Sequence, residues 1–269
     1  MSTLIGGKRV LVTAGGSGIG RAIVDRFIAA GAHVHTCDVQ KDFLKEVVST
    51  NERVTASLAD VGVPGEVETL VADAVDAMGG VDVLINNAGI GGPTAALEDI
   101  SYADWDRTIG VNLNGMFYCI KNVAPHMKAQ GSGCIVNIST ASAKVSLPQR
   151  SPYVASKVGV LGLTHTVARE YGPFGIRCNT ISPGAIATPI FWGGSARANT
   201  LTDDHNAALM RKLQANLARA TPMGKSGLAE DIANAALYLA SDDGRFVNSH
   251  DLVVDGGRTS LFIDPPAAD

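Results

Sequence analysis

Short runs of β-branched and other apolar residues alternate with longer segments of helical periodicity along most of this chain. The short runs predict about seven strands, at residues 9–13, 32–38, 53–58, 82–86, 134–139, 177–181 and 252–255. The longer segments predict helices at 20–30, 64–78, 105–130, 152–171 and 204–218. Because strands that alternate with helices form parallel sheets with crossover helices, the pattern predicts an α/β fold. We expect one domain over residues 1–269, with a doubly wound parallel sheet and helices on both of its faces.

One segment departs from this alternation. Thirty-two residues separate Pro189 from Pro222, and connections of that length inside a compact domain are commonly lids or binding loops. Phe191 and Trp192 stand at the start of the segment. We therefore expect a substrate lid at about 190–221 with these two aromatic side chains facing the substrate, and burial in the core is the alternative interpretation.

Composition limits the class of protein. Of the 269 residues, 46% are hydrophobic and 18% are charged, with a net charge of −4, which predicts a folded domain with a sizeable core. No basic block favours nucleic acid or an anionic membrane as a partner. The four cysteines are scattered without a Cys-x-x-Cys pair, as expected for free thiols in a reduced compartment. Neither the N-terminus nor the uncharged stretch at 178–196 is typical of a signal peptide or a transmembrane helix, so we expect a soluble, cytoplasmic protein.

A glycine-rich turn at 13–20 joins the first predicted strand to its helix. Backbone N–H groups and the helix dipole at such a turn can hold a pyrophosphate. The literal G-x-G-x-x-G pattern does not fit, because Ile23 occupies the last position, and a plain tight turn is the alternative. Ala14 stands at the start of this turn, where alanine in place of glycine is a mild change if its φ is negative.

Asp38 ends the second strand, eighteen residues after Gly20. A carboxylate there can accept hydrogen bonds from both adenosine ribose hydroxyls, and it would repel a 2′-phosphate. We therefore predict NAD as the cofactor in preference to NADP. The alternative is a carboxylate that only caps a loop.

Tyr153 and Lys157 are four residues apart on a predicted helix, so they share one helix face. Ser151 is the expected N-cap of this helix and Pro152 its first helical residue. An ammonium beside a phenol favours the phenolate and lowers its pKa from the usual value of about 10. A tyrosine tuned in this way can act as a general acid or base.

Several further elements follow in a fixed order, namely Asp60-Val61, Asn86-Asn87-Ala88-Gly89, Asn112, Pro183-Gly184 with Thr188, and Val254-Asp255-Gly256-Gly257. With the glycine-rich turn and the Tyr–Lys pair, they cover residues 6–258. This set resembles the single-domain branch of the short-chain dehydrogenase/reductase superfamily. The resemblance implies a Rossmann-type sheet that binds NAD at the carboxyl ends of its strands.

The resemblance also implies roles for individual residues. Tyr153 would be the general acid/base, Lys157 would bind the nicotinamide ribose and lower the pKa of the tyrosine, and Asn112 would hold a water of a proton relay. The cofactor contacts would be Gly15, Ser17, Gly18, Ile19, Gly20, Asp38, Val39, Asp60, Val61, Asn87, Ala88, Gly89, Tyr153, Lys157, Pro183, Gly184, Ile186 and Thr188.

The fourth member of the catalytic set is open. The superfamily usually has a serine thirteen residues before the tyrosine, and here that position is Thr140. A threonine hydroxyl offers the same donor and acceptor, while Ser142 and Ser139 are alternatives. Thr140 and Ser142 are also expected substrate contacts, together with Phe191 and Trp192.

These observations predict an NAD-dependent oxidoreductase that interconverts a secondary alcohol and its ketone. The aromatic start of the lid favours a ring-bearing or hydrophobic substrate. A polyol or sugar dehydrogenase of the same family is one alternative, and a non-catalytic NAD-binding regulatory protein is another. His33 and His35 lack a third ligand, so we expect no metal. The resemblance further implies a homotetramer or homodimer.

Overall fold

A computed structural model describes residues 5–192, 198 and 200–260 of the chain. Its centre is a seven-stranded parallel sheet with the strand order β3-β2-β1-β4-β5-β6-β7. The strands are β1 (Arg9–Thr13), β2 (His33–Asp38), β3 (Val54–Leu58), β4 (Val83–Asn86), β5 (Gly133–Ile138), β6 (Ile176–Pro183) and β7 (Asp251–Val254). The strand order reverses between β1 and β4, and in open α/β sheets ligands bind at that switch point, beyond the carboxyl ends of the strands. The predicted fold class is confirmed.

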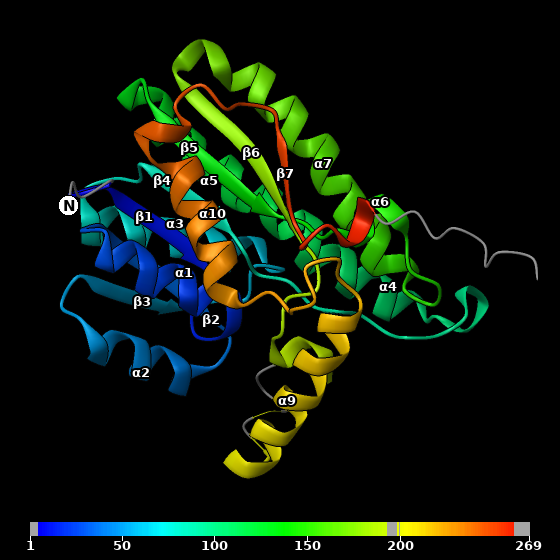
Figure 1. Cartoon of the computed structure of the whole chain (residues 1–269). Helices are drawn as coiled ribbons and strands as arrows, with labels where there is room; N and C mark the ends of the chain where they lie inside the picture. Colours follow the sequence, from blue (N-terminus) through cyan, green and yellow to red (C-terminus); the bar gives the residue numbers. More distant parts are fainter. Residues whose placement is uncertain (1–4, 193–197, 199, 261–269) are drawn as a thin grey trace, which may run out of the picture.

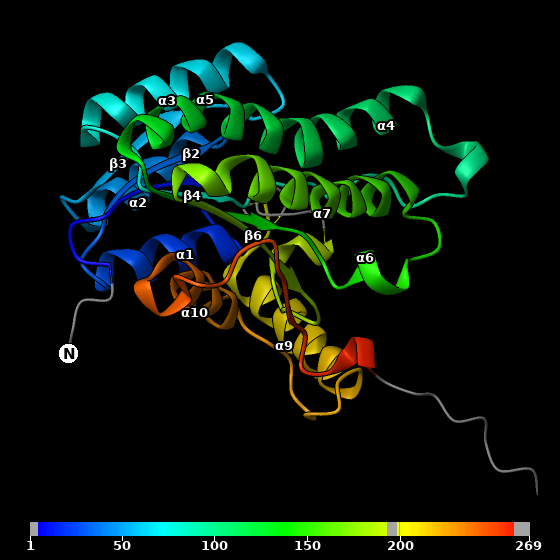
Figure 2. The same ribbon diagram turned by 90° about the horizontal axis from the view of Figure 1, so that it is seen from above.

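Helices cover both faces of the sheet. The long ones are α1 (Gly18–Ala29), α2 (Lys41–Thr50), α3 (Pro64–Met78), α4 (Tyr102–Ile109), α5 (Gly115–Gln130), α7 (Ser151–Tyr171), α9 (Asp203–Arg219) and α10 (Ala229–Ala240), with a short α6 (Ser142–Val145). Figure 1 and the view from above in Figure 2 show α1 and α10 together on one face, and α3, α5, α4 and α7 on the other. The α9 helix projects away from the sheet on the side of α1 and α10.

Alternation along the central strands builds two separate cores. In β1, Val10 and Val12 belong to the cluster under α1 and α10, whereas Leu11 belongs to the cluster under α3, α5 and α7. Successive side chains of a strand point to opposite faces, and a parallel sheet is buried on both. This is why the central strands read as continuous apolar runs instead of alternating ones.

The helix predicted over 105–130 is interrupted. The α4 helix begins at Tyr102, a π-helical turn covers Gly110–Asn114, and α5 follows directly. Such a turn inserts one extra residue per turn and commonly accompanies functional sites. The turn changes which side chains face the sheet. The prediction of one regular α-helix is therefore wrong across these five residues.

The prediction was also incomplete elsewhere. The α2 and α10 helices were not predicted, although α10 buries apolar residues against α1. The α7 helix begins at Ser151 itself, with Arg150 as its N-cap and Pro152 in the first turn, so the expected Ser151 cap is wrong by one residue. Among the described residues, no helix combines the length and apolar character needed to cross a membrane.

Candidate active site

The glycine-rich turn follows β1 at the carboxyl edge of the sheet. Ala14 has φ 54°, in the left-handed region, so the condition under which alanine is a mild replacement for glycine is not met. A Cβ on Gly15 would collide with Thr36 Oγ1, and one on Gly20 would collide with the Ala14 carbonyl oxygen. Gly18 also has positive φ, at 56°, and nothing lies within 4 Å of where its Cβ would be. The turn is therefore packed on its inner side and open at Gly18.

Asn87 ties this turn to the end of β4. Its Nδ2 donates to the carbonyl oxygens of Thr13 (3.0 Å) and Ala14 (3.3 Å). The Thr13 hydroxyl accepts from the backbone N–H groups of Asn87 (3.0 Å) and Ala88 (2.9 Å). These bonds span the switch point, so the two loops flanking it are held in one position.

Asp38 lies buried at the end of β2, next to the same turn. Its carboxylate accepts from the backbone N–H groups of Gly16 (3.3 Å) and Gln40 (3.0 Å). Burial raises the pKa of Asp38, and the backbone N–H donors act against that rise. A Cβ on Gly16 would lie 2.7 Å from Asp38 Oδ2, which explains why glycine is needed beside this carboxylate.

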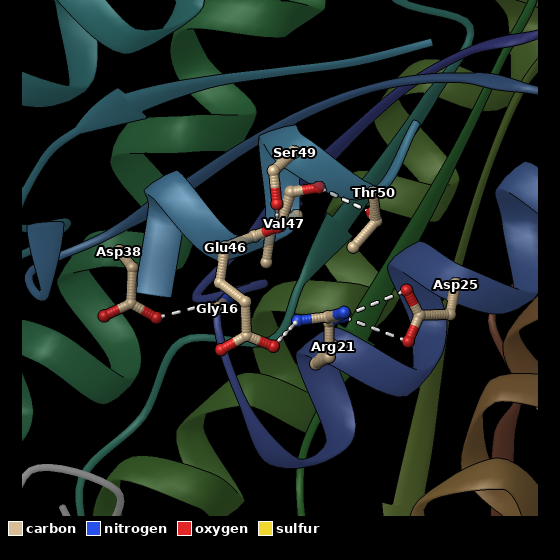
Figure 3. A network of polar contacts seen from close by, with 8 residues as sticks. All are labelled: Gly16, Arg21, Asp25, Asp38, Glu46, Val47, Ser49 and Thr50. Carbon is tan, nitrogen blue, oxygen red and sulfur yellow. Dashed lines mark hydrogen bonds and ion pairs between the residues drawn. The ribbon is translucent and has the colours of Figure 1, made fainter. Parts of the chain in front are cut away.

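Arg21 of α1 already has two acidic partners. Arg21 donates to both carboxylate oxygens of Asp25 (3.0 Å each) and to Glu46 (3.0 Å), as Figure 3 shows beside the contact of Asp38 with Gly16. Its guanidinium is thus shared between two carboxylates.

Asp60 and Val61 follow β3. Arg107 of α4 pairs with the Asp60 carboxylate at 2.6 Å, and the Gly62 N–H donates to it at 2.8 Å. Burial acts to raise the pKa of Asp60, but these donors outweigh it and the pKa is lowered. Val61 is buried and packs closely against Gly115 at the start of α5.

Asn112 lies fully buried in the π-helical turn. Its Oδ1 accepts from the Ile90 N–H (2.8 Å), and its Nδ2 donates to the Ile90 carbonyl (2.9 Å) and to Ser156 Oγ (3.1 Å). One side chain thereby joins the loop after β4 to α7. A Cβ on Gly89 would lie 3.3 Å from both Asn112 Oδ1 and Lys157 Nζ, so Asn112 and Lys157 approach one small space.

Lys157 is 4% exposed, and its Nζ donates to the Ile138 carbonyl at the end of β5 (2.8 Å). Burial lowers the pKa of Lys157 to about 8. Burial also raises the pKa of Tyr153, against the lowering effects of a hydrogen bond with Thr140 and of the Arg150 charge. Burial outweighs these effects, so the expected lowering of the Tyr153 pKa is wrong for the protein alone.

The three candidate hydroxyls occupy different positions. Thr140 is buried, and its side chain acts on Tyr153 by hydrogen bonding, which works to lower the pKa of that phenol. The Ser139 hydroxyl donates to the Lys157 carbonyl instead (2.8 Å). Ser142 begins α6, and its backbone N–H donates to Thr140 Oγ1 (3.2 Å). Among these three described residues, Thr140 is the one whose side chain acts on the pKa of Tyr153.

The segment after β6 leads to the lid. Gly184 packs tightly between Asp255 and Ala141, and Ile186 pairs with Gly227 in a short bridge. Thr188 is buried, whereas Phe191 is 55% exposed. Beyond them, a cavity of about 330 Å³ is lined by Pro189, Ala198, Asn206, Ala207 and Met210. Trp192 ends a 3₁₀ turn at Pro189–Trp192, and its side chain lies outside the described residues, as do positions 193–197 and 199 of the predicted lid.

Comparison with known proteins identifies the family. A family model described as enoyl-(acyl carrier protein) reductase matches residues 13–259, from the glycine-rich turn to the end of the sheet. The chain belongs to the short-chain dehydrogenase/reductase superfamily. It is therefore an oxidoreductase, and the resemblance inferred from its motifs is confirmed.

Relatives within the superfamily span nearly the whole chain. Cyclohexanol dehydrogenase of an Acinetobacter species is 34% identical over 97% of this chain and 98% of its own length. Levodione reductase of Leifsonia aquatica is 35% identical over 94% of both chains, and a crystal structure of levodione reductase matches with a TM-score of 0.84 over 95% of this chain and 98% of that chain. A 3-ketoacyl-(acyl-carrier-protein) reductase from Brucella melitensis, solved in complex with NADH, is 29% identical with a TM-score of 0.84 over 95% of this chain and 99% of that chain.

In this superfamily member, the fold brings together Asn112 of the π-helical turn, Thr140 of the turn after β5, and Tyr153 and Lys157 of α7. Arg150 is a neighbour of Tyr153 that the sequence analysis does not single out. Its guanidinium carbon lies 5.5 Å from the centre of the Tyr153 ring. A cation three residues before a tyrosine at a predicted helix start is the signal that could have found it. In the described ranges, no group of three or more His, Cys, Asp or Glu side chains is placed to hold a metal.

Proposed function

We propose that this protein interconverts a secondary alcohol and its ketone with NAD, using Tyr153 as general acid and base. The observation that carries this proposal is the contact of Thr140 with Tyr153 beside the buried Lys157, at the same sheet edge as the glycine-rich turn. Proton transfer to and from an alcohol oxygen needs three groups in one place, namely a hydroxyl donor, a phenol and a buried ammonium.

The residues at this edge fit a dinucleotide. The turn at Gly15–Gly20 has its inner side filled and Gly18 open, so a phosphate can approach the backbone there without meeting a side chain. Asp38 would hold the adenosine ribose, with Val39, Asp60 and Val61 beside the adenine. Asn87, Ala88 and Gly89 would line the middle, and Pro183, Gly184, Ile186 and Thr188 would hold the nicotinamide end. When bound, the cofactor supplies a hydride acceptor next to the carbinol carbon.

The protein's own groups handle the proton. Thr140 donates to or accepts from the alcohol oxygen and orients it toward Tyr153, which removes the hydroxyl proton during oxidation and returns it during reduction. Lys157 remains close to Tyr153, and its lowered pKa lets it exchange a proton near neutral pH. Asn112 Oδ1 and Lys157 Nζ approach the same space at Gly89, which suits a water that passes the proton to solvent.

The charges around the ribose site support NAD over NADP. A 2′-phosphate would lie against the Asp38 carboxylate. Arg21 of α1 is already paired with Asp25 and Glu46. Binding NADP would place its 2′-phosphate and the Asp38 carboxylate, two anionic groups, together.

The substrate end supports a hydrophobic alcohol or ketone. The cavity after β6 is lined mainly by apolar side chains, with Asn206 as its polar member. Phe191 is exposed at the lid start and free to cover a bound ring. The relative that acts on cyclohexanol supports a ring-bearing substrate.

We further propose that the protein acts in the cytoplasm as a homotetramer or homodimer. Phe117 of α5 and Val158 of α7 are 46% and 45% exposed on the helices of one sheet face, and exposed apolar side chains on neighbouring helices suit a subunit interface. Light scattering coupled to size-exclusion chromatography tests this, and a mass near 27.8 kDa would contradict it.

The direct test measures NADH formation from a panel of cyclic, aromatic and sugar-derived secondary alcohols, with NAD and NADP in parallel. We expect an absorbance rise with NAD on the cyclic alcohols that Tyr153→Phe abolishes, while NAD binding by the variant is retained. Activity on sugar-derived alcohols alone would favour a polyol dehydrogenase. NAD binding without turnover of any alcohol, unchanged by Tyr153→Phe, would favour a regulatory protein and contradict the proposal.

A further inference from the structure

Arg150 is the N-cap residue of α7 and lies against the reaction centre. Its guanidinium carbon is 5.5 Å from the Tyr153 ring centre, and its Nη1 donates to Thr94 Oγ1 at 2.6 Å. A Cβ on Gly91 would lie 2.8 Å from its Nη2. The guanidinium is thus enclosed by the loop that follows β4 on one side and by Tyr153 on the other.

Unlike three other arginines of the chain, Arg150 has no acidic partner in the described structure. Arg9 pairs with Asp82, Arg21 with Asp25 and Glu46, and Arg107 with Asp60. For Arg150, no ion pair with a described carboxylate is formed, and its Nε is buried without any hydrogen-bond acceptor. A buried donor without a partner costs free energy, and more so when it is charged.

The unpaired donors are on one edge of the guanidinium. Nη1 is used by Thr94, whereas Nε and the adjacent Nη2 have no acceptor among the described residues. That edge is the one with which arginine binds a carboxylate or similar oxyanion through two parallel hydrogen bonds.

We propose that Arg150 is a specificity residue that binds an anionic substituent of the substrate, a carboxylate or a sulfonate. This inference rests on the proposed function, since it places the substrate's reacting carbon at Tyr153. The anion lies a few bonds from the carbinol carbon, because the Arg150 guanidinium carbon is 5.5 Å from the centre of the Tyr153 ring. The remainder of the substrate is hydrophobic and occupies the apolar side of the site. The preferred substrate is thus a hydrophobic secondary alcohol that carries one oxyanion.

An alternative role for Arg150 acts only through Tyr153. The Arg150 charge lowers the pKa of that phenol, so its removal could slow every substrate equally. The two roles differ in what they change. Anion binding alters the ratio of kcat/KM between a charged substrate and a neutral one of the same shape, whereas tuning of Tyr153 leaves that ratio unchanged.

The experiment compares 3-hydroxycyclohexanecarboxylate, the corresponding sulfonate and the neutral primary carboxamide, each with NAD. The enzymes are the wild type, Arg150→Gln and Arg150→Lys. Arg169→Gln is the matched control, because Arg169 is an exposed arginine near the far end of the same helix. We expect Arg150→Gln to reduce the carboxylate-to-carboxamide ratio of kcat/KM by about 100-fold, mainly through KM. The ratio for Arg150→Lys should lie between those of the wild type and Arg150→Gln, since lysine keeps the charge but not the paired donors. The control should not change the ratio.

A binding measurement separates this proposal from the proposed function. Calorimetry in the presence of NADH measures cyclohexanecarboxylate, cyclohexanesulfonate and cyclohexanecarboxamide, none of which can be oxidised at a carbinol. Anion binding by the wild type that Arg150→Gln abolishes supports the proposal even if no alcohol is turned over, and the relative affinities show which oxyanion is preferred. The proposal is overturned if the anions bind no better than the carboxamide, or if Arg150→Gln lowers turnover of charged and neutral alcohols equally.

Discussion

At the scale of single residues, the site depends on ionisable and hydroxyl side chains taken out of water. Lys157 has no carboxylate partner in the described structure, and burial alone brings its pKa to about 8. Burial also raises the pKa of Tyr153. Both shifts disfavour the charged form. The tyrosine therefore needs the Thr140 hydroxyl, nearby cations and the bound cofactor before its proton becomes easy to remove.

Thr140 should be the catalytic hydroxyl. Thr140→Ala is expected to lower kcat by about 10- to 1000-fold, the usual range for a lost transition-state hydrogen bond. Thr140→Ser should retain most activity because it keeps the hydroxyl. Steady-state kinetics on a turned-over alcohol measures both. Near-normal kcat in Thr140→Ala together with a large loss of kcat in Ser142→Ala would assign the role to Ser142.

His35 should make the protein sensitive to acid. It is buried between Thr55 Oγ1 (2.8 Å) and Ser57 Oγ (3.0 Å), and burial lowers its pKa to about 4, against a raising effect of Asp73. In the unfolded chain the pKa is near 6.5, so the unfolded state binds an extra proton between these values. Stability contributed by neutral His35 is complete above about pH 6.5 and is lost as pH falls toward 4.

The measurement is urea unfolding from pH 7.5 to pH 4.5 for the wild type and His35→Gln. Over this range the wild type should lose up to about 3 kcal/mol more than the variant, from 1.36 kcal/mol per pKa unit. His33→Gln is the matched control, because His33 is exposed on the same strand. Parallel pH profiles for all three proteins would show that His35 is protonated equally in both states.

At the scale of secondary-structure elements, the π-helical turn between α4 and α5 is the feature that places Asn112. The extra residue per turn directs this side chain toward the loop after β4, where it pairs with both polar groups of the Ile90 backbone. Through Ser156 it also reaches α7. One turn of irregular helix therefore connects three elements that hold the site.

Replacing Asn112 by Ala should destabilise the fold by about 2 kcal/mol, since it leaves buried backbone groups unpaired. It should also lower kcat, because the loop and α7 lose their connection. Asn114→Ala is the control, as Asn114 lies in the same π-helical turn but is only partly buried. Urea unfolding and kinetics on both variants test this. Equal losses in the two variants would mean that the turn is sensitive to any substitution and that Asn112 has no special part.

At the scale of the whole molecule, the cofactor would contact loops that follow β1, β2, β3, β4 and β6. A ligand that joins so many strand ends binds the folded state alone and stabilises it. At about 100 times its Kd, NAD should contribute about 2.7 kcal/mol. For a domain of this size that corresponds to a rise in Tm of about 5–10 °C.

NADP at the same concentration should produce a much smaller rise in Tm, because its 2′-phosphate meets Asp38. Asp38→Asn should reduce the effect of NAD and bring the two cofactors closer together. Asp42→Asn, at an exposed position on α2, is the matched control and should preserve the wild-type difference. Thermal unfolding with each cofactor tests this, and equal stabilisation of the wild type by NAD and NADP would contradict the predicted preference.

The chain by itself determined the features that depend on neighbours in sequence. The strands, the α3 and α7 helices and the Tyr153–Lys157 spacing follow from local periodicity and the four-residue repeat of a helix. The order along the chain of the glycine-rich turn, Asn86–Gly89, the Tyr153–Lys157 pair and the other motifs of the set indicated the superfamily. These features are local because hydrophobic pattern and turn chemistry act over a few residues.

Only the tertiary structure decided what depends on contacts between distant segments. Ser139, Thr140 and Ser142 are hydroxyl residues within four positions of the chain, and sequence alone does not separate them. The turn after β5 directs Thr140 to Tyr153 and Ser139 to the Lys157 carbonyl. The left-handed φ of Ala14, the π-helical turn at Asn112 and the buried Arg150 Nε without an acceptor have the same origin. Each results from packing and hydrogen bonding across the sheet edge, where groups far apart in the chain meet and local propensity is overridden.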